Sequence, residues 1–294
     1  MQTFRIEGGR PLQGEVTASG NKNAALPLLA ACLLTDQPVV LRNVPDIGDV
    51  RSMRNLLASL GVQIETIDQH TWRVQAKEVR RADLDPDICR RMRASVLLAG
   101  PMTARCGGVS LPPPGGDVIG RRRIDTHILA LRSMGAQVAY RGREFAFDAS
   151  QRLHGADVLL DEASVTATEN AIMAAVTARG ETVIRNAASE PHVQDLCTML
   201  NALGARIENI GSNTLHIAGV GSLGGGEHTI GPDYLEVVSF IGAAVVTGGS
   251  VRVCNAGPEH LHMARLVFQR LGVGWDVDGQ DVVVPAGQRL EVEP

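Results

Sequence analysis

The stretch from Pro112 to His127 combines the residue types that acid–base chemistry on an anion requires. It reads PPPGGDVIGRRRIDTH, so prolines and glycines precede one carboxylate, Asp117, and three arginines follow it. Arginine forks pair with carboxylates and phosphates, and a carboxyl group can deliver a proton where its surroundings raise its pKa. The pattern indicates either a functional loop that binds an anionic ligand or a rigid surface connector with solvated arginines.

Further polar side chains stand where nearly all-apolar segments begin. Lys22 and Asn23 open one such segment, Arg93 opens a second, and Ser164 and Thr166 precede a third. Helix N-termini carry free N–H groups and partial positive charge, so they attract anions. Ordinary capping accounts for the asparagine and the serine. It does not account for the two cations, which oppose the helix dipole and are better explained by a bound anion.

An internal repeat places these residues at equivalent positions. A Leu/Met-Gly-Val/Ala signature recurs, and three strand-like runs end in asparagine. The signature glycines and the asparagines are Gly61, Gly135, Gly204, Gly272, Asn43, Asn186 and Asn255. The repeat predicts an α/β fold built of β-α-β-α-β-β units. In each unit an all-apolar helix is buried, a second helix is amphipathic, and the strands form the outer walls. No GxGxxG motif follows a strand, which argues against a Rossmann fold.

Composition narrows the classes of protein further. The 294 residues are 44% hydrophobic, enough to fill a sizeable core, and the net charge of −4 argues against a nucleic-acid binder with a broad basic face. The N-terminus lacks a signal-peptide pattern, and the longest apolar stretch, residues 24–34, is too short to cross a membrane. The five scattered cysteines predict reduced thiols and no metal site. These features predict a cytoplasmic protein.

Five motifs in this order resemble one family: SGNKNAALPLLAA, MRASVLLAGPMTAR, GGDVIGRRRIDTHILAL, ASEPHVQDL and PDYLEVVSF. The family is that of the UDP-N-acetylglucosamine enolpyruvyl transferases (MurA, or 1-carboxyvinyltransferases), within the EPSP synthase-like superfamily. The resemblance implies transfer of enolpyruvate from phosphoenolpyruvate to UDP-N-acetylglucosamine, with release of phosphate, in peptidoglycan precursor synthesis. It implies no cofactor, and partners that are these two small molecules rather than nucleic acid or membrane.

The resemblance also implies an architecture. Family members fold as two inside-out α/β barrels of three repeats each, with the substrates in the cleft. Four of the six repeats are recognisable here. We expect residues 22–231 to form the first barrel domain, and residues 1–21 plus 232–294 to form an incomplete second domain.

Site residues follow by position. Lys22 and Asn23 correspond to phosphoenolpyruvate contacts, with Lys22 also catalytic, and Arg93 and Arg122 to arginines of the substrate cleft. Asp117 stands where many members carry a loop cysteine that donates a proton. We expect the loop to bring this carboxylate in after the substrate binds. The contacts to the nucleotide sugar correspond to Arg122, Arg123, Ile124, Asp125, Thr126, Ser164 and Val165.

Several positions depart from the family pattern and keep two alternatives open. Glu162 and Tyr234 replace a lysine and an arginine, and Arg123 replaces a proline. The first two substitutions suggest a paralogue that acts on another nucleotide or sugar. The sequence also ends at Pro294, before the family's last repeats, so no residue can be assigned as the general base. We therefore expect little turnover from this chain alone, which is compatible with a catalytically silent ligand-binding fragment.

Overall fold

The chain forms two compact units, and both of its ends belong to the smaller one. The computed structural model describes residues 3–80, 84–116 and 123–292. The larger unit is Lys22–Ile230, and the smaller unit joins Met1–Asn21 to Gly231–Pro294.

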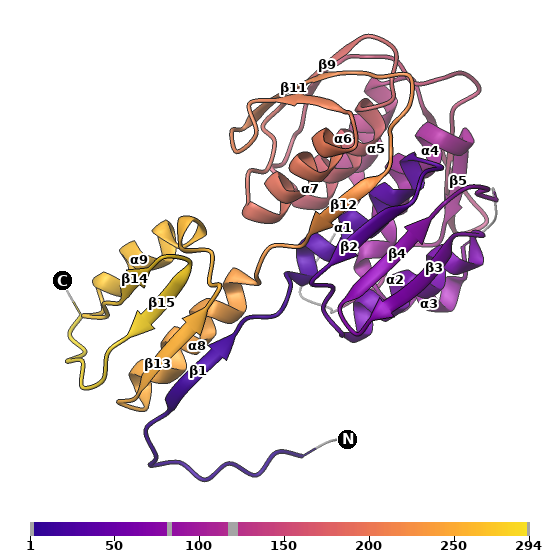
Figure 1. Ribbon diagram of the computed structural model, residues 1–294. Coiled ribbons are helices and arrows are strands. Elements are labelled where there is room, and N and C mark those ends of the chain that lie inside the picture. The colour runs from indigo at the N-terminus through magenta and orange to yellow at the C-terminus, as the bar shows by residue number, and fades with distance from the viewer. Residues whose placement is uncertain (1–2, 81–83, 117–122, 293–294) are drawn as a thin grey trace. The chain divides into compact units, whose positions relative to one another are not determined.

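The described residues of the larger unit form three β-sheets (Figure 1). Two share one plan: an edge strand runs parallel to its neighbour, and the other two pairings are antiparallel. Among its described strands, the third sheet has antiparallel pairings alone. In sheet order, the strands are β12 (Gly226–Thr229), β2 (Val39–Arg42), β4 (Thr71–Gln75) and β3 (Gln63–Asp68); β8 (Asp157–Leu159), β9 (Glu181–Arg185), β11 (Thr214–Ala218) and β10 (Arg206–Glu208); β5 (Gly108–Leu111), β7 (Glu144–Asp148) and β6 (Gln137–Arg141).

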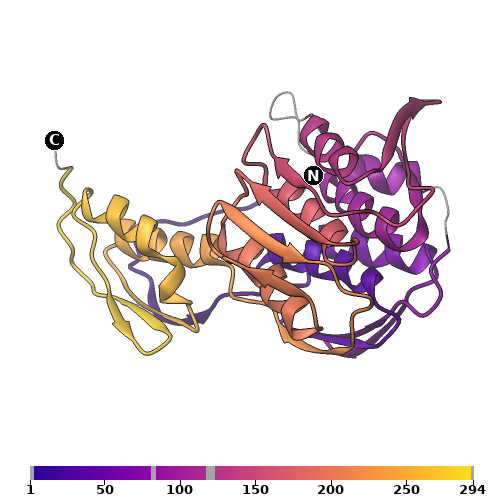
Figure 2. The ribbon, with the colours of Figure 1, turned by 90° about the horizontal axis from the view of Figure 1, so that it is seen from above.

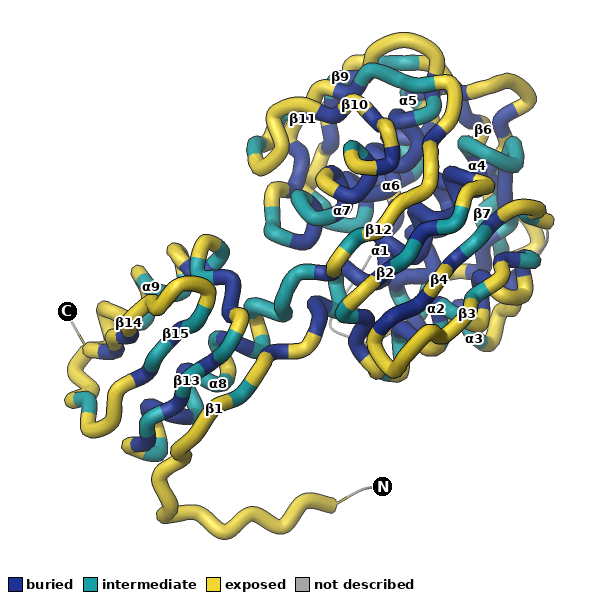
Figure 3. Tube along the Cα trace, in the orientation of Figure 1, coloured by how far each residue is buried: buried dark blue, intermediate teal, exposed yellow. Residues whose placement is uncertain are grey.

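The helices of the larger unit supply most of its core. α1 and α6 are buried along almost their whole length because they are apolar nearly all round, and their alanines allow neighbouring helices to approach closely. α2 instead buries one face. Figure 3 shows the same contrast between buried helices and exposed outer loops. The helices are α1 (Lys22–Ala31), η1 (Cys32–Leu34), α2 (Gly48–Ser59), α3 (Pro86–Arg91), η2 (Arg93–Leu98), α4 (Ala99–Cys106), α5 (Asp125–Ser133), α6 (Val165–Ala175) and α7 (Pro191–Ala202).

One four-stranded sheet and two α-helices make up most of the smaller unit. The sheet order is β1 (Gln13–Thr17), β13 (Ser250–Cys254), β15 (Asp281–Val284) and β14 (Asp276–Asp278). The helices are α8 (Tyr234–Val246), η3 (Pro258–His260) and α9 (His262–Gln269), which Figure 2 shows from a second direction. Val237 and Ile241 of α8 pack with Val253 and Val282 of the sheet. No helix in the described residues is long and apolar enough to cross a bilayer.

The signature positions of the sequence adopt left-handed backbone conformations. Asn43, Asn186 and Asn255 have φ angles of 58°, 57° and 49°. Asparagine tolerates this region because its short amide can bond to nearby backbone, and the side chains of Asn43 and Asn186 donate to the carbonyls of Ile230 and Leu160. The four signature glycines also have positive φ, as required of the residue that ends a helix. The motif residues are therefore explained by local backbone geometry.

Candidate functional site

Arg93 links two segments that the sequence separates by thirty residues. It begins η2, and its Nη2 donates a hydrogen bond to the carbonyl of Arg123, 2.7 Å away, just before α5. The same arginine lines a pocket of about 410 Å³. The described lining residues are Arg93, Pro113, Pro114, Arg123, Ile124, Asp125 and Phe145. Four of the predicted site residues thus share one cavity wall, and two of them are cationic.

The two glycines before Asp117 lie against the segment that carries Arg93. The N–H groups of Gly115 and Gly116 donate to the carbonyls of Cys89 and Arg90, at 3.0 and 3.3 Å. A Cβ added at Gly115 would overlap the carbonyl of Arg90, so only glycine fits there. Asp117 and Arg122 themselves lie outside the described residues, and movement of the loop stays a prediction.

Side-chain hydrogen bonds connect the first turn of α5 to α6 and to the segment just before it. Thr126 Oγ1 donates to Asp161 Oδ1 at 2.7 Å, and the ring of His127 contacts Thr166 Oγ1 at 3.1 Å. Ser164 is the N-cap of α6, and its Oγ accepts the N–H of Ala167. These contacts hold the predicted residues Asp125, Thr126, Ser164 and Val165 on two helix ends that pack together.

Lys22 begins α1, as expected, and it has an acidic partner that sequence reasoning missed. Its Nζ lies 2.8 Å from Oδ2 of Asp49 in the first turn of α2, and both side chains are partly exposed. A lysine at this end opposes the dipole of its own helix, and the carboxylate offsets that charge. Asn23, the next residue of α1, is half-buried. Neither Lys22 nor Asn23 is among the described lining of the 410 Å³ pocket.

A buried acid, Glu169, and a half-buried acid, Glu190, lie near these helix ends. Within the described residues, Oε1 of Glu169 in α6 has no hydrogen-bond partner, and neither has the buried Oε2 atom of Glu190, which precedes α7. Burial raises the pKa of Glu169 well above its ordinary value, and the negative charge of Glu190 raises it further. Both effects favour the protonated, neutral form of Glu169. The sequence signal was the polar pair Glu169 and Asn170 within a mostly apolar helix.

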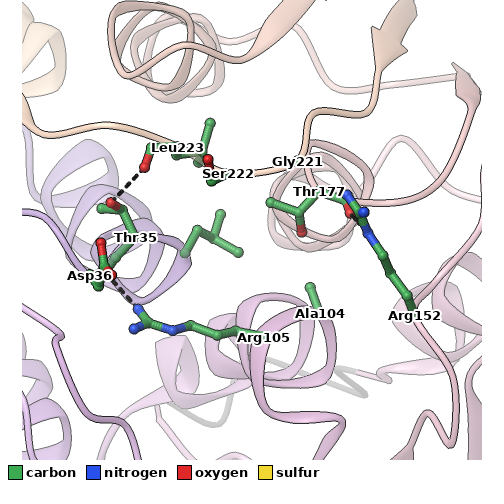
Figure 4. A pocket seen from close by; sticks show the side chains of 10 residues that line it. Thr35, Asp36, Ala104, Arg105, Arg152, Thr177, Gly221, Ser222 and Leu223 are labelled. Atoms are coloured by element: carbon green, nitrogen blue, oxygen red, sulfur yellow. Dashed lines mark hydrogen bonds between the residues drawn. The ribbon is translucent and has the colours of Figure 1, made fainter.

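A second pocket, of about 270 Å³, lies near the C-terminal ends of η1, α4 and α6 (Figure 4). Arg105 and Arg152 are in its wall. Arg105 donates to the carbonyls of Leu33 and Thr35, both at 2.6 Å, and Arg152 donates to the carbonyl of Thr177 at 2.7 Å. These guanidinium groups satisfy backbone carbonyls that helices leave unpaired at their ends, so this pocket has a structural explanation.

No cluster of three or more His, Cys, Asp or Glu side chains suited to a metal ion occurs within the described residues. The five cysteines are all free thiols, and burial raises the pKa of Cys32 and Cys197 to about 12. These two thiols are therefore protonated and unreactive in the folded protein.

The chain matches known proteins along nearly its whole length. The family model for EPSP synthase (3-phosphoshikimate 1-carboxyvinyltransferase) matches residues 6–294. The UDP-N-acetylglucosamine 1-carboxyvinyltransferase of Bradyrhizobium diazoefficiens is 54% identical over 291 residues, which cover 99% of this chain and 67% of that protein. The protein of the same name from Treponema denticola is 50% identical, with coverages of 99% and 68%. The chain thus spans about two thirds of the length of these relatives.

Solved structures of enolpyruvyl transferases are similar to this chain in fold. The enolpyruvyl transferase NikO from Streptomyces tendae has a TM-score of 0.82 at 25% identity, covering 95% of this chain and 67% of that one. EPSP synthase from Acinetobacter baumannii has a TM-score of 0.75 at 19% identity, with coverages of 97% and 67%, which supports the fold alone. The predicted α/β class is confirmed, and so is the resemblance carried by the five motifs. The chain belongs to the EPSP synthase family and, within it, to the UDP-N-acetylglucosamine 1-carboxyvinyltransferases.

Proposed function

We propose that the protein transfers the enolpyruvyl group of phosphoenolpyruvate to UDP-N-acetylglucosamine and releases phosphate. The observation that carries this proposal is the identity of 43–54% to proteins of that name over essentially the whole chain. The pocket wall formed by Arg93, Arg123 and Asp125 supports it, because the substrates carry phosphate and carboxylate groups that guanidinium groups bind well. The reaction supplies a peptidoglycan precursor, needs no redox cofactor, and is placed in the cytoplasm.

The finer architecture is part of the proposal. We propose that residues 22–231 form one inside-out α/β barrel, that residues 1–21 with 232–294 belong to a second, and that four of six repeats are present. Three sheets with the same parallel-antiparallel-antiparallel pairing support a repeat of this kind. The shared left-handed asparagines and glycines support it as well.

The site residues are assigned by charge and position. Lys22 and Asn23 bind phosphoenolpyruvate, and Arg93 and Arg122 lie along the substrate cleft. The segment from Arg122 to Thr126, with Ser164 and Val165, binds the nucleotide sugar. The described members of this set lie at the N-terminal ends of α1, η2, α5 and α6, where helix dipoles favour anions.

Asp117 is proposed as the proton donor. The sugar hydroxyl loses its proton as its oxygen attacks C2 of phosphoenolpyruvate, and a proton is delivered to the methylene carbon. The adduct then loses phosphate from C2 and a proton from the methyl group that was formed. Because aspartate is ionised at neutral pH, its pKa must rise in the complex. The negative charge of the bound substrates and the exclusion of water on loop closure act in that direction, against the neighbouring arginines.

Binding and turnover test the proposal separately. We expect isothermal titration calorimetry to show binding of UDP-N-acetylglucosamine to the 294-residue chain. Arg93→Gln should weaken that binding about tenfold or more, because a hydrogen bond to a charged group is lost. Arg206→Gln, at an exposed position in β10, is the matched control and should not. Phosphate release on adding phosphoenolpyruvate reports turnover. A wild-type chain that does not bind the nucleotide sugar contradicts the proposal.

A different acceptor is the second candidate, because Glu162 places an acid where relatives of this type often carry a lysine. Titrating a panel of uridine and other nucleoside diphosphate sugars distinguishes the two. Preference for UDP-N-acetylglucosamine by tenfold or more supports the first, and preference for another nucleotide sugar supports the second.

A further inference from the structure

A chain of buried polar groups connects three helices of the larger unit. Asn170 in α6 accepts the N–H of Gly100 in α4 at 2.6 Å, through Oδ1. Its Nδ2 lies 2.9 Å from the carbonyl of Val96 and 2.9 Å from Nδ1 of His127 in α5. The other ring nitrogen of His127, Nε2, lies 3.1 Å from Oγ1 of Thr166. This series of hydrogen bonds therefore begins at a backbone amide in the core and ends at the Thr166 hydroxyl in the first turn of α6.

The backbone N–H of Gly100, at the start of this series of hydrogen bonds, determines which atom is the donor in each of them. An N–H group can only donate, so the Asn170 atom that faces Gly100 must be the carbonyl oxygen. The other end of the amide is then the NH₂ group, which donates to the Val96 carbonyl and to His127 Nδ1. Nδ1 must be an acceptor, so the ring carries its single proton on Nε2 and donates it to Thr166 Oγ1.

The environment of His127 keeps the ring in this state. The side chain is buried, and burial lowers its pKa to about 3, with a further contribution from the positive charge of Arg93. Protonating Nδ1 would also place two donors against each other at Asn170. A neutral imidazole with one fixed tautomer is the result.

Because Thr166 Oγ1 accepts a hydrogen bond from the fixed His127 ring, its own hydroxyl hydrogen must point away from that ring. Oγ1 accepts from His127, and His127 is the one hydrogen-bond partner that the described residues give this oxygen. Thr166 is half-buried, and it directly follows Val165. We propose that Thr166 is a further substrate-binding residue, whose hydroxyl donates a hydrogen bond to a phosphate oxygen of the nucleotide sugar, and that His127 and Asn170 are the positioning residues that aim it.

The proposal rests on the proposed function, and the local chemistry explains why a phosphate oxygen is the acceptor. Ser164 Oγ caps the N–H of Ala167, which leaves the earlier N–H groups of the turn without partners inside the helix. With the imidazole donating to Oγ1, Thr166 presents a hydrogen to the ligand. A cluster of donors suits a charged oxygen. Glu162, two residues before the cap, supplies no cation there, so the donors that this turn itself offers are neutral.

Thr166→Val and Thr166→Ser form the first test, with titration of UDP-N-acetylglucosamine and UDP into the full chain. Valine has the same shape without the hydroxyl, and we expect it to weaken binding of both ligands about 10- to 100-fold. Serine should stay within about threefold of wild type.

Each other result overturns part of the argument. Wild-type affinity in Thr166→Val, or equal losses in the valine and serine variants, overturns the role of the hydroxyl while the proposed function stands. A loss for the nucleotide sugar but not for UDP overturns the phosphate as acceptor. A wild-type chain that binds neither ligand overturns both proposals.

The positioning role of His127 has its own pair of variants. His127→Gln can place an amide N–H near the position of Nε2, so it keeps a donor to Thr166. His127→Asn can reach only the position of Nδ1, so it keeps the partner of Asn170 but loses that donor. We expect glutamine to bind the nucleotide sugar about tenfold more tightly than asparagine at matched thermal stability. Equal affinities in the two variants overturn the positioning role.

Discussion

At the scale of single residues, the Glu169 side chain makes the stability of the larger unit depend on pH. Its pKa in the folded state is raised by burial and by Glu190, so the folded state holds a proton that the unfolded state releases. Its contribution is fully present below the unfolded pKa of about 4.3 and is lost as pH rises through the folded value. A difference of one pKa unit between the two states corresponds to about 1.4 kcal/mol.

Glu169→Gln should remove this dependence, because a neutral amide replaces the neutral acid. We expect urea unfolding to show that the variant gains stability relative to wild type between pH 5 and pH 8. Glu208→Gln, at an exposed position in β10, serves as the control and should follow the wild-type curve. A wild-type stability that does not fall relative to Glu169→Gln as pH rises contradicts a buried neutral Glu169.

The proposed role of Asp117 as proton donor has a pharmacological consequence. Fosfomycin alkylates the loop thiolate of cysteine-bearing family members, and a carboxylate is a much weaker nucleophile toward an epoxide. In an active form of the enzyme, we expect no time-dependent inactivation of wild type and clear inactivation of Asp117→Cys. Asp117→Asn should lose roughly 10²-fold in phosphate release, because an amide cannot deliver the proton. Undiminished turnover by the asparagine variant would exclude Asp117 as the donor.

At the scale of elements, the contact between α4 and α6 depends on one glycine. A Cβ added at Gly100 would lie 2.5 Å from the backbone oxygen of Asn170 and 2.7 Å from its Oδ1. Backbone cannot give way as a flexible side chain can, so Gly100→Ala should cost about 1–3 kcal/mol. Gly48→Ala, in open space at the start of α2, is the matched control and should be neutral or slightly stabilising. Thermal unfolding measures both, and equal effects would contradict this account.

Arg105 in α4 forms hydrogen bonds both to the C-terminal end of η1 and to the segment that follows β4. Its guanidinium group donates to the carbonyls of Leu33, Thr35 and Ala76, at 2.6, 2.6 and 2.5 Å. Arg105→Met would leave these oxygens without their donor, and we expect a loss of roughly 2–4 kcal/mol in chemical unfolding. Arg105→Lys keeps the charge but offers a single ammonium, so it should recover only part of the loss. Full recovery by lysine would mean that charge alone matters.

Sequence patterns predict some features of these elements and not others. Gly61 and Asn43 were recognisable as motif positions because a backbone with positive φ selects glycine in four copies and asparagine in three. Lys22 and Arg93 could be selected as candidate site residues from the sequence because a cation at a helix start conflicts with the helix dipole. Asp49 was not, because its contact with Lys22 depends on how α1 and α2 pack, which local patterns do not encode.

His127 was missed for a related reason. It occupies a core-facing position of α5, at the spacing of the buried Ala130 and Leu131, where sequence reasoning expects apolar packing. Only the three-dimensional meeting of α4, α5 and α6 supplies the partners that make a buried imidazole acceptable.

At the scale of the whole molecule, exposed apolar side chains concentrate in the smaller unit. In the described part of the chain they include Leu235, Val246, Met263, Leu266 and Val267. Apolar groups left in water favour association, so we expect sedimentation velocity to show concentration-dependent self-association. Met263→Lys with Val267→Lys should reduce it, whereas Leu159→Lys, on an exposed strand of the larger unit, should not. Monomeric behaviour of wild type at every concentration would contradict this expectation.

The parallel pairing of β1 with β13 sets an order of events during synthesis. Gln13 lies opposite Ser250 and Thr17 opposite Cys254, so almost the entire larger unit is translated between one strand and its partner. The N-terminal strand leaves the ribosome early and has no sheet to join until residue 254 has emerged. The larger unit, whose strands and helices all lie between these two segments, can meanwhile close on itself, since β12 returns to pair with β2 before β13 is made. The N-terminal strand of a nascent chain therefore stays unpaired while the larger unit folds, and the smaller unit forms after the larger one.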